Sequence, residues 1–266
     1  SLIVTVDNGV SANAAIAHAK EQGVDVVVTD HHLPPQTLPE AAAIVNPQLP
    51  GDESPCKTLS GAGVAFKLAA ALDGCTPDEM LPFYGDLAAI GTIADIMLLE
   101  GENRRIVKAG LALLQQTERP GIAALIEACG LGGKELTAEN VSFGLAPRLN
   151  AAGRMDSAAA ALELLLCEDP EEAEAIVAGL EAQNAARQKA EQDILQGVLD
   201  SVAADETYGA DRILVVWGRG YHQGVIGIVA SRVVERFGKP AIIVSVDENG
   251  EGKGSGRSIA GVSLYN

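Results

Sequence analysis

Two adjacent histidines directly follow an aspartate at the end of an apolar run, in the stretch Val26-Val27-Val28-Thr29-Asp30-His31-His32. The β-branched residues predict a strand, and the Pro34-Pro35 pair prevents regular structure from continuing. Because the carboxyl ends of parallel strands open onto the ligand crevice of an α/β sheet, we expect the three polar residues at the edge of a site. One imidazole can then bind a metal while the other faces a ligand. The alternative is a polar turn that only happens to hold two histidines.

Two more carboxylates stand in positions that suit a cation ligand. Asp7 ends the apolar run 2–6, and the runs 2–6 and 25–29 predict the two strands of a right-handed β-α-β unit. Both strands then end in an aspartate at the same edge of the sheet. Asp95 lies between the apolar stretches 91–94 and 96–99. A carboxylate in such a setting is costly unless it is paired or coordinates a cation.

Three other stretches could bind an anion. Ser60-Gly61-Ala62-Gly63 leads into a predicted helix and either cradles a phosphate or only permits close packing. The stretch 143–154 holds Arg148, Asn150 and Arg154, and the planar arginine fork suits phosphate oxygens. Pairing of the two arginines with acids on neighbouring helices is the alternative. Gly254-Ser255-Gly256-Arg257-Ser258 offers backbone amides, hydroxyls and a guanidinium together, without the spacing of a phosphate-binding Walker loop.

The elements that would position these residues follow from hydrophobic periodicity and from capping residues. Ser11 is expected to cap a helix that ends at Gly23, and a highly charged helix over 169–204 is expected to be a solvated connector between domains. Further strands are predicted at 41–45, 212–217 and 241–246, and further helices at 64–72, 82–99, 103–116, 120–129 and 225–237. This alternation predicts an α/β protein with a parallel sheet.

Composition narrows the class of protein. The chain has 266 residues, which is enough for one large domain or two smaller ones. No apolar run is long enough to span a membrane, and the scattered cysteines Cys56, Cys75, Cys129 and Cys167 indicate reduced thiols in a cytoplasmic protein. The net charge of −17 alone disfavours nucleic acid, but five basic residues against two acids between Tyr208 and Lys239 leave a locally basic region.

The motifs, taken in order, resemble those of the DHH phosphoesterase superfamily, and in particular its bacterial single-strand-specific DNA exonucleases. The resemblance runs from residue 1 to about residue 261, and it is carried by Val6-Asp7-Asn8-Gly9, Asp30-His31-His32, Gly91-Thr92-Ile93-Ala94-Asp95, Pro147-Arg148-Leu149-Asn150-Ala151-Ala152-Gly153-Arg154, His222-Gln223-Gly224 and Gly254-Ser255-Gly256-Arg257-Ser258. It implies a DHH domain at 1–157, a connector helix at 158–206 and the start of a DHHA1-like domain at 207–266.

The resemblance also implies a mechanism and its residues. The expected activity is metal-dependent 5′→3′ hydrolysis of single-stranded DNA in DNA repair and recombination, with two Mn²⁺ ions in the intact site and Mg²⁺ as the alternative. Asp7 would bridge both ions, His31 and Asp95 would complete the shell of one, and His32 would orient or neutralise the scissile phosphate. Substrate-binding residues would be Arg148, Asn150, Arg154, His222, Gln223, Ser255, Arg257 and Ser258. Expected partners are single-stranded DNA, a helicase and a single-strand-binding protein.

Two other functions compete with this one. The first is a small-substrate enzyme of the superfamily, such as an oligoribonuclease, a cyclic-dinucleotide phosphodiesterase or a pyrophosphatase. The second is a non-catalytic DNA-binding scaffold, against which the presence of Asp7, His31, His32 and Asp95 speaks. Family members carry an aspartate-rich motif before the position of Asp7 and a Gly-Gly-His motif after residue 266. We therefore expect this chain to be a central fragment whose catalysis alone is impaired.

Overall fold

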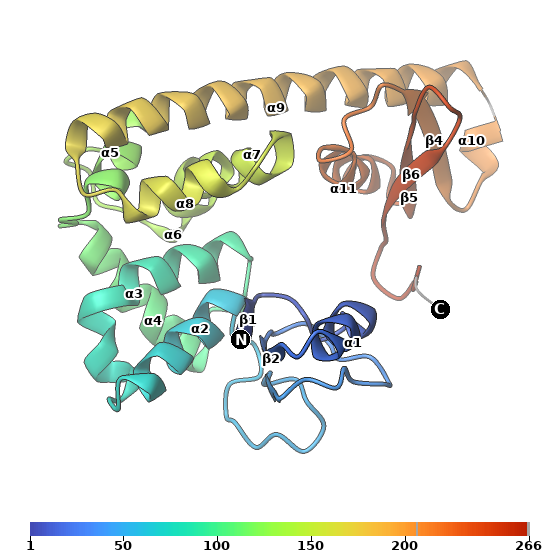
Figure 1. The fold of residues 1–266 in the computed structure, drawn as a ribbon. Helices are drawn as coiled ribbons and strands as arrows, with labels where there is room; N and C mark the ends of the chain where they lie inside the picture. Colours follow the sequence, from blue (N-terminus) through green and yellow to red (C-terminus); the bar gives the residue numbers. More distant parts are fainter. Residues whose placement is uncertain (206, 265–266) are drawn as a thin grey trace. The chain divides into compact units, whose positions relative to one another are not determined.

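The computed structural model describes residues 1–205 and 207–264, and the chain forms two compact units, Ser1–Pro147 and Arg148–Asn266. Figure 1 shows the helices and strands of both units, coloured along the sequence. The two units are called the first and the second unit below. The division into a domain at 1–157 and a separate connector stays a prediction.

A parallel sheet of three strands carries the site of the first unit. Its strands are β1 (Leu2–Val6), β2 (Asp25–Thr29) and β3 (Ala43–Val45), in the order β1-β2-β3. The helix α1 (Asn13–Glu21) joins β1 to β2, which confirms the predicted β-α-β unit. Ser11 was expected to cap α1, but the helix begins later, at Asn13, after Ala12 and without a side-chain cap. Gly23 has the positive φ of 70° that the chain needs to leave this helix.

Four α-helices, packed next to the sheet or on one another, complete most of the first unit. Ser60 caps α2 by accepting a hydrogen bond from the Gly63 amide, and Thr76 forms a capping box with Glu79 at the start of α3. The helix α3 ends before Asp95, which is its C-cap, so the prediction of a helix as far as residue 99 is wrong. The bounds are α2 (Gly61–Leu72), α3 (Pro77–Ala94), α4 (Gly101–Leu114) and α5 (Pro120–Ala128).

One wide helical turn precedes the arginine-bearing helix. The short α6 (Ala138–Asn140) continues into the π-helix η1 (Val141–Leu145) and then into α7 (Ala146–Met155). Pro147 has no amide hydrogen to donate to the preceding turn, and a π-bulge is one way in which a helix accommodates a missing bond. The amide of Ala146 accordingly bonds to the carbonyl of Val141, five residues earlier.

The long predicted helix is present as α9 (Pro170–Ala204), and Asp169 caps it through the amides of Glu171 and Glu172. Its charge predicted a solvated helix, but one face is buried within the second unit against α8 (Ala159–Leu166), α11 (Ile226–Phe237) and β4 (Leu214–Arg219). The buried residues recur at helical spacing, and they are Ala173, Val177, Leu180, Asn184, Glu191, Ile194 and Val198.

A second sheet lies in the second unit, with the order β4-β5-β6. The helix α11 connects the parallel strands β4 and β5 (Ala241–Val246), and the short α10 (Thr207–Ala210) precedes β4. The stretch expected to offer a cluster of amides is instead the strand β6 (Gly252–Arg257), antiparallel to β5. Successive amides of a strand point to opposite edges, so this segment cannot form an anion-binding nest.

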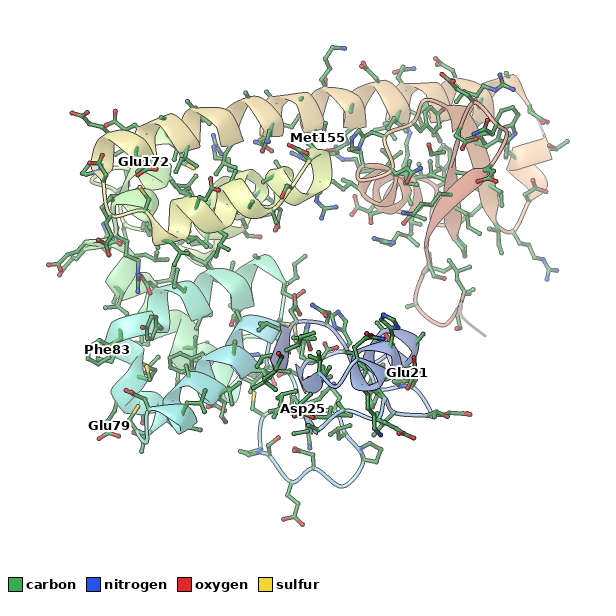
Figure 2. The ribbon with its side chains drawn as sticks, in the orientation of Figure 1. Glu21, Asp25, Glu79, Phe83, Met155 and Glu172 are labelled. Atoms are coloured by element: carbon green, nitrogen blue, oxygen red, sulfur yellow. The ribbon has the colours of Figure 1, made fainter. Side chains whose placement is uncertain are left out.

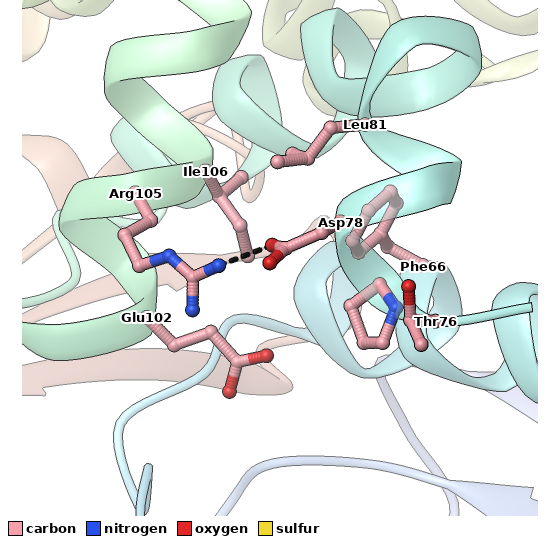
Figure 3. Close-up of a pocket in the computed structure, with 8 residues that line it drawn as sticks. Phe66, Thr76, Asp78, Leu81, Glu102, Arg105 and Ile106 are labelled. Carbon is pink, nitrogen blue, oxygen red and sulfur yellow. Dashed lines mark hydrogen bonds and ion pairs between the residues drawn. The ribbon is translucent and has the colours of Figure 1, made fainter.

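Other features of the described residues narrow the search for a site. No cysteine forms a disulfide, and no described helix is long and apolar enough to cross a membrane. A cavity of about 110 Å³ lies in the first unit among residues of α2, α3 and α4. Figure 3 shows the residues that line it, with the ion pair between Arg105 and Asp78. This cavity is lined by none of the residues that the sequence nominated.

Candidate metal centre and basic cluster

Asp7, His31 and Asp95 lie together in the first unit, at the carboxyl edge of its sheet. The His31 Nε2 atom is 3.0 Å from Oδ1 of Asp7 and 3.4 Å from Oδ2 of Asp95. Asp7 follows β1, His31 lies just beyond the end of β2, and Asp95 ends α3. Ligand atoms of Asp7, His31 and His32 also lie within 4.8 Å of one another. The structure therefore brings together, from three elements, all four residues that the sequence nominated around a cation.

The His31 ring nitrogen has neighbours but no hydrogen-bond partner. Its side chain is 9% exposed, and its Nε2 atom, although close to two carboxylates, makes no hydrogen bond of acceptable geometry among the described residues. A buried polar atom without a partner is rare and costly in proteins. One imidazole nitrogen and two carboxylates facing the same point are a donor set that suits Mn²⁺ or Mg²⁺. The residues present thus fit a divalent cation.

Asp30 is the buried anchor that holds His32. Its Oδ2 atom accepts a hydrogen bond from the amide of Val10, and its Oδ1 atom accepts bonds from the amides of His31 and His32. The His32 Nδ1 atom lies 2.7 Å from the same Oδ1. Because an ionised carboxylate only accepts, Nδ1 of His32 must carry the proton. Asp30 therefore fixes the tautomer and the orientation of His32.

These contacts shift the pKa values of both partners. Burial acts to raise the pKa of Asp30, but the hydrogen bonds from Val10, His32 and His31 together lower it below its usual range. The hydrogen bond to Asp30 raises the pKa of His32, against partial burial, and the negative charges of Asp30, Asp7 and Asp95 raise it further. A charged His32 beside a carboxylate cluster is suited to an anionic ligand that approaches the same edge.

Strained backbone conformations flank the metal centre. Among the described residues, only Asp7 (φ 62°) and Ile96 (φ 56°) combine a positive φ with a side chain. Aspartate tolerates this region, but a β-branched isoleucine is an outlier there. Such strain collects at functional sites, where the surrounding structure imposes it. Ile96 occupies the position after the C-cap Asp95, where helices commonly place glycine.

Removing the backbone strain at Ile96 should stabilise the protein. Ile96→Gly should raise the stability of the first unit by about 1 kcal/mol, because the left-handed conformation costs a residue with a Cβ about that much. The Ile96 side chain is 86% exposed, so little burial is lost. Thermal unfolding followed by circular dichroism measures the change. Leu98→Gly is the matched control, since Leu98 is 61% exposed with an ordinary φ, and it should destabilise. A lower melting temperature for Ile96→Gly would show that the backbone is not strained.

Gly61 belongs to the stretch 60–63, for which the sequence left both phosphate binding and close packing open. A Cβ atom at Gly61 would lie 2.3 Å from Oδ1 of Asp7, so only glycine lets the first turn of α2 approach this carboxylate. The positive end of the helix dipole favours a negative charge at this position. The anion held at the start of α2 is therefore the side chain of Asp7, and the close-packing alternative describes Gly61.

A basic cluster, Arg154, Arg187 and Arg257, lies within the second unit. Partial burial lowers the pKa of Arg154, and the positive charges of Arg187 and Arg257 lower it further. Gly224 and Gly227, near the start of α11, leave room for Arg154 and Arg257 to lie against this part of the unit. A Cβ at Gly224 would lie 2.1 Å from the carbonyl oxygen of Arg154, and one at Gly227 would lie 3.1 Å from Nη2 of Arg257 and 3.0 Å from Oγ of Ser255. The negative charge of Glu191 acts in the opposite direction on the pKa of Arg154. The excess of positive charge around Arg154 favours an anionic ligand.

The remaining nominated residues of the second unit differ in their surroundings. His222 accepts a hydrogen bond at Nδ1 from the amide of Gly224, next to the basic cluster. Arg148 forms an ion pair of 3.2 Å with Glu181 on α9, which is the structural alternative considered for it. Asn150 is exposed on α7, and Ser258 donates its hydroxyl to the carbonyl of Val262. Gln223 lies in the turn before α11. Their roles in binding a substrate stay predictions.

Arg187 and the two residues that bond to it, Asn184 and Glu191, were not identified from the sequence. Arg187 bonds to Asn184 and to the buried Glu191, which also pairs with Arg232 of α11. Asn184 and Glu191 follow the buried spacing of α9. A buried acid and amide in register with apolar residues was the signal available in the sequence.

Comparison with known protein families gives one match in each unit. The model of the DHH family, N-terminal domain, matches residues 1–92, and the model of the DHHA1 domain matches residues 210–266. The single-stranded-DNA-specific exonuclease RecJ of Bacillus subtilis is 47% identical over 100% of this chain and 33% of its own length. The RecJ of Salmonella typhimurium is 42% identical over 99% of this chain and 48% of its own length. The chain thus spans a third to a half of these relatives.

Solved structures of RecJ are also similar to this chain. The crystal structure of RecJ in complex with Mn²⁺ from Thermus thermophilus matches with a TM-score of 0.82 and 39% identity, over 98% of this chain and 38% of that one. The corresponding structure with Mg²⁺ matches with a TM-score of 0.77 and 38% identity, over 99% of this chain and 37% of that one. The chain therefore belongs to the DHH family, with a DHH domain followed by a DHHA1 domain, and it is similar to RecJ along nearly all of its length.

Proposed function

We propose that this chain is the catalytic part of a metal-dependent phosphodiesterase that degrades single-stranded DNA from the 5′ end, in DNA repair and recombination. The observation that carries the proposal is the buried His31 Nε2 atom, which faces Asp7 and Asp95 and has no hydrogen-bond partner among the described residues. The similarity to single-stranded-DNA-specific exonucleases supports the choice of substrate.

The metal ligands in this proposal are Asp7, His31 and Asp95. Mn²⁺ is the preferred ion because the donors mix imidazole nitrogen with carboxylate oxygen, and Mg²⁺ is the alternative. The similar structures hold these same two ions. A pair of divalent ions activates water and stabilises charge on both the attacking and the leaving oxygen of a phosphodiester. Asp7, more exposed than His31, is proposed to contact both ions of an intact site.

His32 is proposed as the catalytic residue that meets the phosphate. Asp30 holds its Nδ1 proton, so Nε2 is the ring nitrogen available for a ligand. The raised pKa of His32, caused first by the hydrogen bond to Asp30, favours the imidazolium. A positive charge at this edge can orient the scissile phosphate and stabilise the charge that develops on its oxygens.

The second unit is proposed to bind the DNA backbone. Arg154, Ser255 and Arg257, with His222 beside them, offer guanidinium, hydroxyl and imidazole groups around the start of α11. Arg148, Asn150, Gln223 and Ser258 remain proposed contributors to DNA binding.

We also propose a division of the chain into a DHH domain at 1–157, a connector at 158–206 and a DHHA1 domain from 207. The protein is proposed to act in the cytoplasm, together with a helicase and a single-strand-binding protein.

The substrate is tested by comparing polymers with short nucleotides. In a protein that also carries the aspartate-rich and Gly-Gly-His motifs of the family, the proposal expects Mn²⁺-dependent release of mononucleotides from long 5′-phosphorylated single strands, with much slower hydrolysis of linear and cyclic dinucleotides. Duplex DNA of the same sequence is the control for strand preference. Faster turnover of dinucleotides than of long strands would assign the chain to the small-substrate enzymes of the family.

Arg257→Ala tests the basic cluster. We expect this change to weaken the binding of a single-stranded oligonucleotide about tenfold at low salt, to reduce the slope of binding against salt by about one unit, and to leave Mn²⁺ affinity unchanged. Fluorescence anisotropy over a range of salt concentrations measures both quantities. Arg236→Ala removes the same charge from an exposed position on the last turn of α11 and is the matched control. Equal salt slopes for the two variants would make Arg257 a structural residue.

A further inference from the structure

Two buried hydroxyl groups join α2 to α3 next to the metal centre. Ser60 is 1% exposed and Thr92 is fully buried, and their side-chain oxygens are 3.1 Å apart. Thr92 Oγ1 lies 2.7 Å from the carbonyl oxygen of Ala88, to which it donates its only proton. Ser60 must then donate to Thr92, while it accepts from the amide of Gly63. The chain of bonds therefore runs from Gly63 through Ser60 and Thr92 to Ala88, and neither hydroxyl lacks a donor or an acceptor.

Each end of this hydroxyl pair lies beside a proposed metal ligand. Thr92 is in the last turn of α3, three residues before the C-cap Asp95. Ser60 is the N-cap of α2, and the next residue, Gly61, lies against the carboxylate of Asp7. A Cβ at Gly91 would meet the Cβ of Ala62 at 2.4 Å, so the two helices touch at this level without a side chain between them. The hydroxyl pair thus ties together the two helix ends that contact Asp7 and Asp95.

We propose that Ser60 and Thr92, with Gly61, are positioning residues that set the separation of the Asp7 and Asp95 carboxylates on either side of His31. This inference rests on the proposed cation site. A directional hydrogen bond fixes the rotation of the last turn of α3 against the first turn of α2, whereas apolar contact between the same helices would leave that rotation adjustable. Cation binding needs that rotation fixed, because two carboxylates must meet one ion at bonding distance.

Mn²⁺ affinity tests the proposal independently of catalysis. The protein is titrated with Mn²⁺ alone, and the free ion is followed by its electron paramagnetic resonance signal. Thr92→Val keeps the shape of the side chain and removes the hydroxyl, and it should weaken Mn²⁺ binding about tenfold, as expected for a group that supports a ligand. Thr92→Ser restores the hydroxyl and should remain within about threefold of the unsubstituted protein. Gly61→Ala tests the other arm and should also weaken binding by about tenfold or more.

Thr76→Val is the matched control. Thr76 caps the opposite end of the same helix α3, so its replacement lowers the stability of α3 without touching the hydroxyl pair. We expect Thr76→Val to lower the melting temperature and to leave Mn²⁺ affinity unchanged. A loss of affinity in Thr76→Val equal to that in Thr92→Val would attribute both losses to general destabilisation, and would overturn the proposal.

The remaining outcomes separate this inference from the proposed function. If Asp7→Asn removes Mn²⁺ binding while Thr92→Val and Gly61→Ala bind as tightly as the unsubstituted protein, the cation site stands and the positioning role is wrong. If Asp7→Asn itself binds Mn²⁺ normally, the cation site is wrong and this inference with it. Alanine suits the first turn of a helix, and the three atoms nearest to a Cβ at Gly61 all belong to the side chain of Asp7. Gly61→Ala therefore disturbs mainly Asp7, and it tests the proposal even if Thr92→Val does not fold.

Discussion

Asp7→Asn is expected to lower Mn²⁺ affinity by about 100-fold or more and to reduce any Mn²⁺-dependent release of nucleotides from single-stranded DNA at least as much. The amide keeps the size of the side chain but removes the negative charge that lies 3.0 Å from the His31 ring nitrogen. Loss of a ligand should cost more than the roughly 10- to 100-fold typical of a supporting group. Charge stabilisation during phosphodiester cleavage depends on the same ion, so we expect turnover to fall about 10³-fold.

Asp73→Asn is the control for this change. Asp73 is an exposed aspartate at the other end of α2, the helix whose first turn contacts Asp7. It makes the same change in total charge and should leave both Mn²⁺ affinity and turnover unaltered. Isothermal titration with Mn²⁺ and a nuclease assay on 5′-phosphorylated strands give the two measurements. Normal Mn²⁺ binding by Asp7→Asn would remove this residue from the metal centre.

Asp30→Asn should have the second largest effect, although Asp30 is not a proposed ligand. Its carboxylate accepts four hydrogen bonds, from the amides of Val10, His31 and His32 and from the His32 ring. An amide nitrogen cannot accept, so at least one buried donor loses its partner, and the first unit should lose about 3 kcal/mol of stability. The His32 ring also loses the group that fixes its tautomer, and turnover should fall about 100-fold or more.

Asp25→Asn is the matched control, because Asp25 begins the strand that Asp30 follows. Figure 2 labels Asp25, which is exposed at the start of β2. The same substitution there should change neither stability nor turnover by a measurable amount. Denaturant unfolding measures the first quantity, and the nuclease assay measures the second. Our account of Asp30 would be wrong if Asp30→Asn unfolded at the same denaturant concentration as Asp25→Asn.

Local sequence was sufficient to predict the two strands that end at the candidate metal centre. The β-branched runs before Asp7 and Asp30 form parallel strands, and α/β geometry then places both aspartates at one edge. The long charged helix predicted over 169–204 is present as α9, Pro170–Ala204. These predictions succeeded because strand preference, capping and turn formation act over a few neighbouring residues.

Local sequence was not sufficient where two residues of the same type have the same preference. Arg148 and Arg154 are six residues apart on α7 and were nominated together, but Arg148 pairs with Glu181 while Arg154 lies in the basic cluster. Six residues correspond to a rotation of about 240° on an α-helix, so the two side chains face different neighbours. Which face meets an acid and which meets other arginines depends on how α9 and α11 pack.

The segment around Ser255 and Arg257 shows the same limit. The sequence nominated it as an anion-binding group of amides and side chains, but most of it forms the strand β6, because the residues Ala241–Val246 offer a β-branched partner strand. Strand formation depends on the neighbouring strand more than on the residues of the strand itself. The antiparallel register then places Ser255 and Arg257 next to Gly227 of α11.

The sequence by itself identified the candidate cation ligands Asp7, His31 and Asp95 and the candidate phosphate-binding residue His32, in the order seen in the DHH family. Only the tertiary structure decided that Asp95 reaches His31, that Gly61 admits Asp7 and that Asp30 holds His32. The reason is physical. Helix and strand formation depend on nearby residues, whereas distances of about 3 Å between groups far apart in the chain depend on how whole helices pack.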